Sequence, residues 1–194
     1  MRIANWVLTA SAAIATVMAT SSPLAAQPQA VQLPFVSNGL PSLADVLTRS
    51  RQARIMFDYL RDSAQVSTVL VDPSGSSTVL APVDSAILAL ARKPHEGPES
   101  FDEPDIRSNE EERRRAEYLE QWVKAHLVLE KVDLEADGWD GKEYTTMAGS
   151  TVRFATSDAD GRKVLPGDVE VVGEEQASNG KVLYLRGTLK VPSA

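Results

Sequence analysis

The chain has 194 residues and a formal net charge of −7, with 43% hydrophobic and 24% charged residues. This balance is typical of one globular domain, and the acidic excess argues against a general binder of nucleic acid or anionic membranes, because phosphates need a basic surface. The chain contains no cysteine, which excludes disulfides, thiol catalysis and zinc–thiolate sites.

The first 26 residues have the pattern of a secretory signal peptide. Arg2 precedes an uncharged run over residues 6–18, and small residues follow up to Ala26. This run is shorter than the roughly 20 apolar residues that span a bilayer. We expect cleavage after Ala26, with cleavage within 19–21 or an uncleaved anchor as alternatives, and a mature protein in the cell wall, outside the cell or in a vacuole lumen.

Helical signals follow an extended start. Residues 27–41 contain three prolines and predict an extended lead-in. Ser42 is a good N-cap residue, and apolar residues at helical spacing after it predict a helix to Arg49. A second helix is predicted over residues 52–64, with its arginines facing outward.

The pattern then changes to one that is typical of strands. Residues 68–71 and 78–81 are β-branched apolar runs on either side of an Asp-Pro-Ser-Gly sequence, so we expect two paired strands. Pro82 ends the second run. Asp84 is expected to cap a short helix that continues to Leu90.

Residues 92–117 are the most charged part of the chain. Nine acidic and six basic residues among these 26 predict a solvated insertion that is mobile over 92–108. Ser108 and Glu111 have capping-box spacing, and a helix should follow to about Ala125. The three arginines at 113–115 could bind a phosphate or a sulfated sugar, but the neighbouring glutamates favour local salt bridges.

The last third alternates apolar and polar residues with a period of two. The runs at 151–154 and 169–171 alternate in this way, and the run at 182–185 is apolar on both faces, as expected for a central strand. The turn sequences that separate these runs include Asn179-Gly180, which predicts a hairpin turn with positive φ. The whole order predicts an α+β domain.

No catalytic, cofactor-binding or metal-binding residue is predicted. Ser178 and Lys181 have Ser-x-x-Lys spacing, but the Asn-Gly between them favours a turn over the helix that such an active site needs. The calcium-loop likeness at 158–161 lacks the acidic residue required at the last ligand position. We expect His126 to pack in the core with its ring bonded to backbone, and His95 to face solvent.

Three segments resemble motifs of the fasciclin domain family. Residues 77–86 resemble its first motif, a strand that leads into Ala-Pro-x-Asp and a short helix. Residues 119–128, with His126, resemble its central histidine motif. Residues 177–189 resemble the closing Ser-Asn-Gly hairpin and last strands.

The resemblance covers residues 40–191, with some departures. Leu80 stands where an aromatic residue is usual, and residues 183–185 replace an Ile-His-Val-like strand. The sequence Arg92-Lys93-Pro94 before a charged insertion is similar to the single-domain fungal branch.

The resemblance implies a wedge or sandwich of antiparallel strands flanked by helices, in one domain over residues 42–191. It further implies a non-catalytic secreted or lumenal protein for adhesion or cell-wall contact, with a protein or carbohydrate partner and no membrane span after signal removal. The alternatives are a carrier of a small apolar ligand and a wall-active hydrolase, for which Glu174 and Glu175 are an exposed and unpromising carboxylate pair.

Overall fold

A computed structural model describes residues 39–98, 108–157 and 161–191. The predicted signal peptide and most of the lead-in lie outside these residues, as does the part of the charged insertion from 99 to 107. The described residues belong to the unit Pro34–Ala194.

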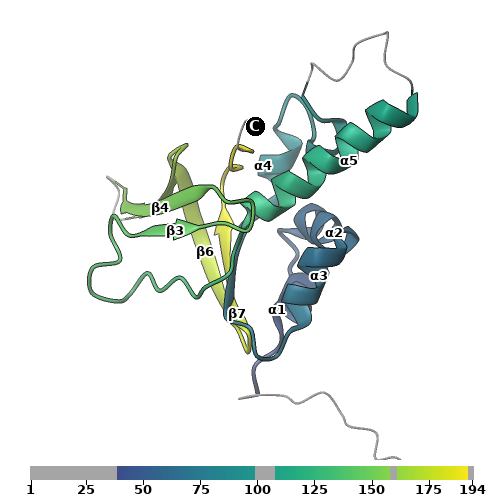
Figure 1. Cartoon of the computed structure of the whole chain (residues 1–194). Coiled ribbons are helices and arrows are strands. Elements are labelled where there is room, and N and C mark those ends of the chain that lie inside the picture. The colour runs from purple at the N-terminus through teal and green to yellow at the C-terminus, as the bar shows by residue number, and fades with distance from the viewer. Residues whose placement is uncertain (1–38, 99–107, 158–160, 192–194) are drawn as a thin grey trace, which may run out of the picture. The chain divides into compact units, whose positions relative to one another are not determined.

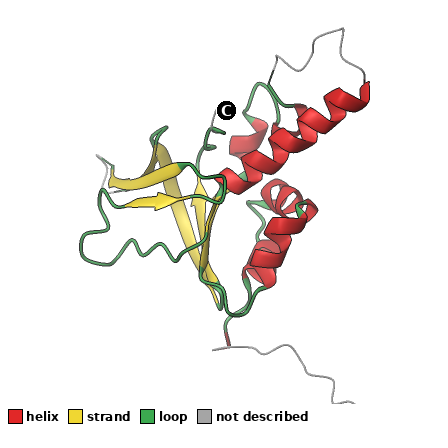
Figure 2. Cartoon of the chain, in the orientation of Figure 1, coloured by secondary structure: helices red, strands yellow, loops and turns green. Residues whose placement is uncertain are grey.

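The helices form a layer on one side of the strands, as Figures 1 and 2 show. Three short helices come first, a fourth follows the first strand, and the longest precedes the remaining strands. Their bounds are α1 Leu43–Arg49, α2 Arg54–Asp62, α3 Ala64–Val71, α4 Asp84–Leu88, the 3-10 turn η2 Pro94–Glu96, and α5 Ser108–Ala125.

The strands form one sheet in the order β2-β1-β7-β6-β5-β4-β3. β1 and β7 run parallel, and the other neighbours are antiparallel. A further bridge between Val128 and Thr146 joins the two ends of the sheet, which therefore nearly closes on itself. The bounds are β1 Ser77–Pro82, β2 Leu127–Val128, β3 Glu143–Thr145, β4 Thr151–Thr156, β5 Arg162–Leu165, β6 Val169–Ala177 and β7 Gly180–Leu185.

The core has two parts, one on each face of the central strands. Val79, Val182 and Tyr184 pack against the helices, whereas Leu80 and Leu183 face the inside of the curved sheet. Because every residue of β1 and β7 is buried, both strands are apolar on two faces. The α+β fold of strands flanked by helices is therefore confirmed, as is the central position of residues 182–185.

The predicted strand at 68–71 is wrong, because these residues end helix α3. Ser63 caps this helix, since its Oγ accepts a hydrogen bond from the Val66 backbone amide at 3.4 Å. Val66 and Leu70, four residues apart, are the buried face of the helix. Burial of this face outweighs the β preference of valine and threonine. Ser63 also ends α2, so the single helix predicted over 52–64 stops at Asp62.

The role predicted for Asp84 is also wrong. Helix α4 begins after Val83 without a side-chain cap, and it ends at Leu88 instead of Leu90. The Asp84 carboxylate accepts a hydrogen bond from the backbone amide of Ile55 at 2.9 Å, and its own amide donates to the Gln52 carbonyl at 2.7 Å. Asp84 therefore caps the first turn of α2 and fixes that helix to the end of β1.

Candidate functional site

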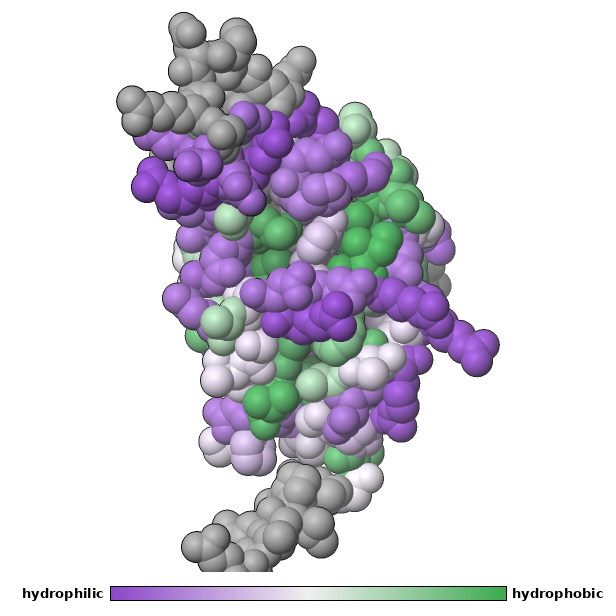
Figure 3. Space-filling model, turned by 90° about the vertical axis from the view of Figure 1, so that its right-hand side faces the viewer, coloured by the Kyte–Doolittle hydropathy of each residue, from purple (hydrophilic) through white to green (hydrophobic). Residues whose placement is uncertain are grey.

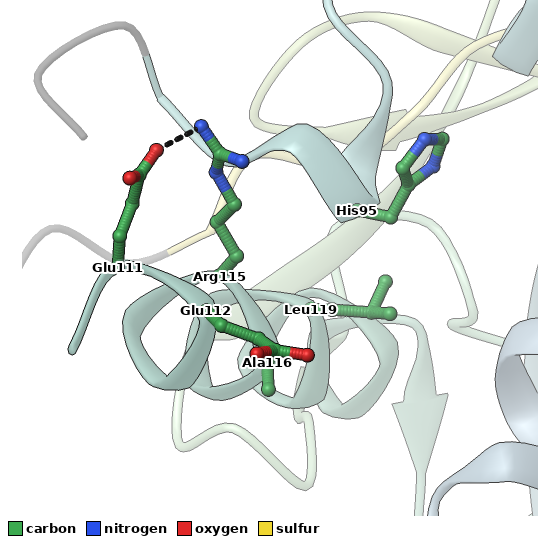
Figure 4. Close-up of a pocket in the computed structure, with 6 residues that line it drawn as sticks. All are labelled: His95, Glu111, Glu112, Arg115, Ala116 and Leu119. Atoms are coloured by element: carbon green, nitrogen blue, oxygen red, sulfur yellow. Dashed lines mark hydrogen bonds and ion pairs between the residues drawn. The ribbon is translucent and has the colours of Figure 1, made fainter. Parts of the chain in front are cut away.

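A surface cleft lies between the N-terminal half of α5 and η2. Its volume is about 510 Å³, and both polar and charged side chains line it (Figure 4). Glu111 and Arg115, one helical turn apart, form an ion pair along α5. The lining residues are His95, Glu111, Glu112, Arg115, Ala116 and Leu119.

The N-terminal half of α5 has charged residues on every side of the helix, at positions 110–115 and 117. Arg113 and Glu117 form a second pair along the helix, with 3.5 Å between the guanidinium and the carboxylate. These pairs confirm local salt bridges for Arg113 and Arg115, two members of the arginine triplet. Since side chains of both signs line the cleft, the site offers hydrogen-bond donors and acceptors to a polar ligand. The cap predicted for Ser108 stays a prediction, because its side chain lies outside the described atoms.

The segment 92–98 contributes one residue to the lining of the cleft, His95 of η2. The Lys93 ammonium donates to the carbonyls of Leu88 and Leu90, at 2.9 and 2.6 Å, and the Arg92 guanidinium donates to the Gly97 carbonyl at 2.9 Å. These bonds tie this part of the predicted insertion to the end of α4. The mobility predicted over residues 92–108 stays a prediction, and residues 99–107 lie outside the described residues.

His95 is exposed, as predicted, and lines the cleft from η2. Its Nδ1 shares a hydrogen bond of 2.8 Å with the Tyr59 hydroxyl. Partial burial raises the pKa of Tyr59, and the nearby carboxylates of Glu96 and Asp58 raise it further. Tyr59 therefore stays a neutral phenol that can bond His95 and contact Trp122 edge-on.

His126 packs in the core with its ring bonded to backbone, as the sequence predicts. The ring is fully buried, with Nδ1 at 2.7 Å from the Trp122 carbonyl and the Leu189 amide donating to Nε2 at 3.0 Å. Nδ1 must carry the ring proton, because its partner is an acceptor and the partner of Nε2 is a donor. Burial lowers the pKa of His126 to about 4, partly offset by the bond to Trp122.

Asn179 holds three segments together, a role that the sequence analysis missed. Its Oδ1 accepts from the Leu43 amide at 2.8 Å, and its Nδ2 donates to the carbonyls of Leu70 and Asp72, each at 3.0 Å. The hairpin between β6 and β7 is confirmed, but its turn residues are Ser178 and Asn179, because Gly180 is the first residue of β7. Only Gly180 of the predicted pair has positive φ, at 153°, so the positive φ predicted for Asn179 is wrong. The side chain of Asn179, and not its backbone conformation, is thus what the fold requires.

The Ser-x-x-Lys spacing does not produce an active site. Lys181 lies on β7, only 2% exposed, and its ammonium is 3.3 Å from the Glu174 carboxylate. Ser178 stands in the hairpin turn, so no helical turn stacks it on Lys181. Glu175 accepts a hydrogen bond from the Tyr184 hydroxyl at 3.0 Å. Glu174 and Glu175 therefore bind different partners and do not converge on one cleft.

A second cavity, of about 620 Å³, is more apolar than the first. It lies where the start of α1, the end of α3 and the β6–β7 hairpin meet. Leu40 and Val71, which line it, are 43% and 60% exposed. Within the described residues, no group of three or more His, Asp or Glu side chains could hold a metal ion.

Comparison with known proteins finds similar sequences in three fungi. Three FAS1 domain-containing proteins, from Aspergillus fumigatus, Neurospora crassa and Emericella nidulans, are 32%, 31% and 32% identical over 77%, 75% and 79% of this chain. The match spans 63% of the length of each relative. A solved FAS1 domain pair from the insect cell adhesion molecule Fasciclin I aligns with 72% of this chain and 45% of its own, with 17% identity and a TM-score of 0.46.

The fold and its motif residues define an α+β domain in which the buried polar groups fasten segments together. The Fasciclin domain profile matches residues 51–189. The chain therefore belongs to the fasciclin domain family. Proteins of this family are generally adhesion-related and non-catalytic, and they are typically extracellular or secreted.

Proposed function

We propose that this protein is an exported, non-catalytic fasciclin module that contacts a protein or carbohydrate partner at the cell wall, outside the cell or in a vacuole lumen. One observation carries this proposal. The motif residues with the most reactive side chains, His126, Asn179 and Lys181, use their polar atoms inside the fold. A partner molecule would therefore bind to surface side chains, such as those that line the cleft between α5 and η2.

The surface chemistry supports a polar partner. On the face that the helices cover, hydrophilic residues form most of the surface and divide the apolar areas from one another (Figure 3). Glu112 is exposed in the cleft, and Arg115 is 36% exposed beside its partner Glu111. A sugar or a polar protein loop can exchange hydrogen bonds with such groups, whereas an apolar interface would leave them unpaired.

The proposed route of export rests on the sequence. Residues 1–26 would direct the chain to the secretory pathway, and 42–191 would form the exported domain. Among the described residues, no helix combines the length and the apolar character needed to cross a membrane.

The carrier alternative has one observation in its favour, the apolar cavity at Leu40 and Val71. Sites for small apolar ligands bury most of the ligand surface. Because Val71 is 60% exposed, this cavity is an open groove, which favours the interaction module. The hydrolase alternative lacks such support, since the carboxylates of Glu174 and Glu175 are held by different partners.

A binding experiment tests the proposal. Purified protein is added to isolated Aspergillus fumigatus cell walls, and the bound fraction is measured for Glu112→Lys and for the matched control Glu135→Lys, an exposed loop residue away from the cleft. We expect the first variant alone to weaken binding by about tenfold, the loss of one good polar contact. Equal binding of both variants would refute the cleft as the binding site. Hydrolysis of wall material would refute a non-catalytic role.

A second experiment tests export. A C-terminal tag leaves the leader free, so the tagged protein should appear outside the cell, in the wall or in the vacuole. A cytosolic signal, or an exported chain that still begins at Met1, would refute the predicted leader.

A further inference from the structure

The dipeptide Asn179-Gly180 has a chemistry that the fold controls. In Asn-Gly sequences the following backbone nitrogen is poorly shielded, because glycine has no side chain. The nitrogen of Gly180 can attack Cγ of Asn179, so that a new C–N bond forms, the Cγ–Nδ2 bond breaks and ammonia leaves with the proton of the attacking N–H. Water then opens the cyclic imide at either carbonyl and leaves aspartate or isoaspartate.

The native structure holds both reacting groups in place. The Asn179 side chain is 1% exposed, and rotating Cγ toward the Gly180 nitrogen would break its bonds to Leu43, Leu70 and Asp72. Gly180 is paired on two sides, with Ser77 of β1 and with β6. The attack therefore requires the hairpin to leave the sheet first.

The product does not fit the site that the asparagine leaves. A carboxylate at position 179 would place an acceptor where Nδ2 donates to two carbonyls, and the buried charge would keep the Leu43 amide as its donor but gain none in place of the two lost bonds. Isoaspartate would also lengthen the backbone next to Gly180, where an added Cβ would already lie 1.9 Å from the Ser77 carbonyl oxygen. Either product therefore prevents the hairpin from docking again.

We propose that Asn179-Gly180 is a fold-gated deamidation site. The native fold protects this dipeptide and unfolding exposes it. A chain that deamidates while unfolded can no longer return to the folded state. The chain has no cysteine, so no disulfide limits its unfolded state. The lifetime of the protein is then set by the fraction of copies in which the hairpin is open, because each reaction of an open copy is irreversible.

The first test compares reaction rates in the native and unfolded protein. The full chain is kept at mildly alkaline pH with and without urea, and peptide mapping follows the change from amide to acid at residue 179. We expect the native reaction to be slower by at least about 100-fold, which corresponds to an opening free energy of about 2.8 kcal/mol. Equal rates would overturn the proposal.

The second test uses another Asn-Gly dipeptide, Asn38-Gly39, as an internal reference. Protein aged in urea is refolded, and the folded and unfolded fractions are separated by size and mapped. Modified residue 38 should occur in both fractions, whereas modified residue 179 should occur only in the unfolded one. The variant Asn38→Asp checks that a change there leaves folding intact.

The variant Asn179→Asp completes the test. We expect it to remain unfolded, or to melt far below the unmodified protein. If aged chains modified at 179 refold as well as unmodified ones, or if Asn179→Asp melts at the normal temperature, the proposal is wrong.

Discussion

Acid should destabilise this domain through His126. Its ring is buried and its two nitrogens have opposite roles, because Nδ1–H donates to Trp122 and Nε2 accepts from Leu189. A second ring proton would face the Leu189 N–H and would bury a charge. For these reasons the native state holds the pKa of His126 at about 4.

The size of the effect follows from this pKa. In the unfolded chain the histidine pKa is near 6.5. Below that pH the unfolded state takes up a proton that the native state refuses, so the free energy of unfolding falls as the pH falls. The loss stops near pH 4, where the native ring is protonated as well. At about 1.36 kcal/mol per pKa unit, the full loss is about 3 kcal/mol.

Urea unfolding at several pH values measures this loss. The variant His126→Gln keeps a donor and an acceptor but cannot titrate, so it should be less stable than the parent at neutral pH, with a gap that narrows by about 3 kcal/mol toward pH 4. The control His95→Gln should keep the pH dependence of the parent, because His126 is intact. Parallel stability curves for the parent and His126→Gln would refute the argument. The chain has only two histidines, so the NMR titration of the His126 ring gives its pKa even if the variant does not fold.

Three further substitutions test local contacts by urea unfolding. Ser63→Ala removes the cap of α3 and should lower the free energy of unfolding by about 1 kcal/mol; no change would mean that the cap is not formed. Asp84→Ala should cost a similar amount, about 1 kcal/mol, by uncapping α2, and an unchanged stability would contradict its assignment to that helix. Gly180→Ala should cost several times more than Gly173→Ala, since only the first Cβ meets the Ser77 carbonyl oxygen; equal melting temperatures would refute the close approach.

Much of the sheet could be predicted from local pattern. The period of two after residue 150 and the turn sequences between the runs predict strands, which the structure confirms as β4, β6 and β7. The run at 68–71 is ambiguous in sequence, because three apolar residues in a row after Thr68 fit either a buried strand or a helix. The useful signal was the spacing of Val66 and Leu70, together with Ser63 as a cap.

The missed contacts have a common physical cause. Asp84 bonds a residue 29 positions away and Asn179 one 136 positions away, so neither partner can be read from nearby sequence. Local rules assign such residues to the nearest helix end or turn, because these are the partners that spacing shows. The cleft was missed for the same reason, since the sequence indicates that 92–117 is charged but not that its two ends pack together.

Three polar residues explain how a domain without cysteines fastens distant segments together. Asn179 ties the last hairpin to α1 and α3, His126 ties α5 to Leu189, and Asp84 ties β1 to α2. The ties of Asn179 and His126 use polar groups that are buried, whereas Asp84 is partly exposed. Among the motif residues, His126 and Lys181 are thus the ones least able to meet a partner, whereas Asp84 and Asn179 also line surface cavities. A binding surface is better sought around the cleft between α5 and η2, which lies in the charged segment between two of the family motifs.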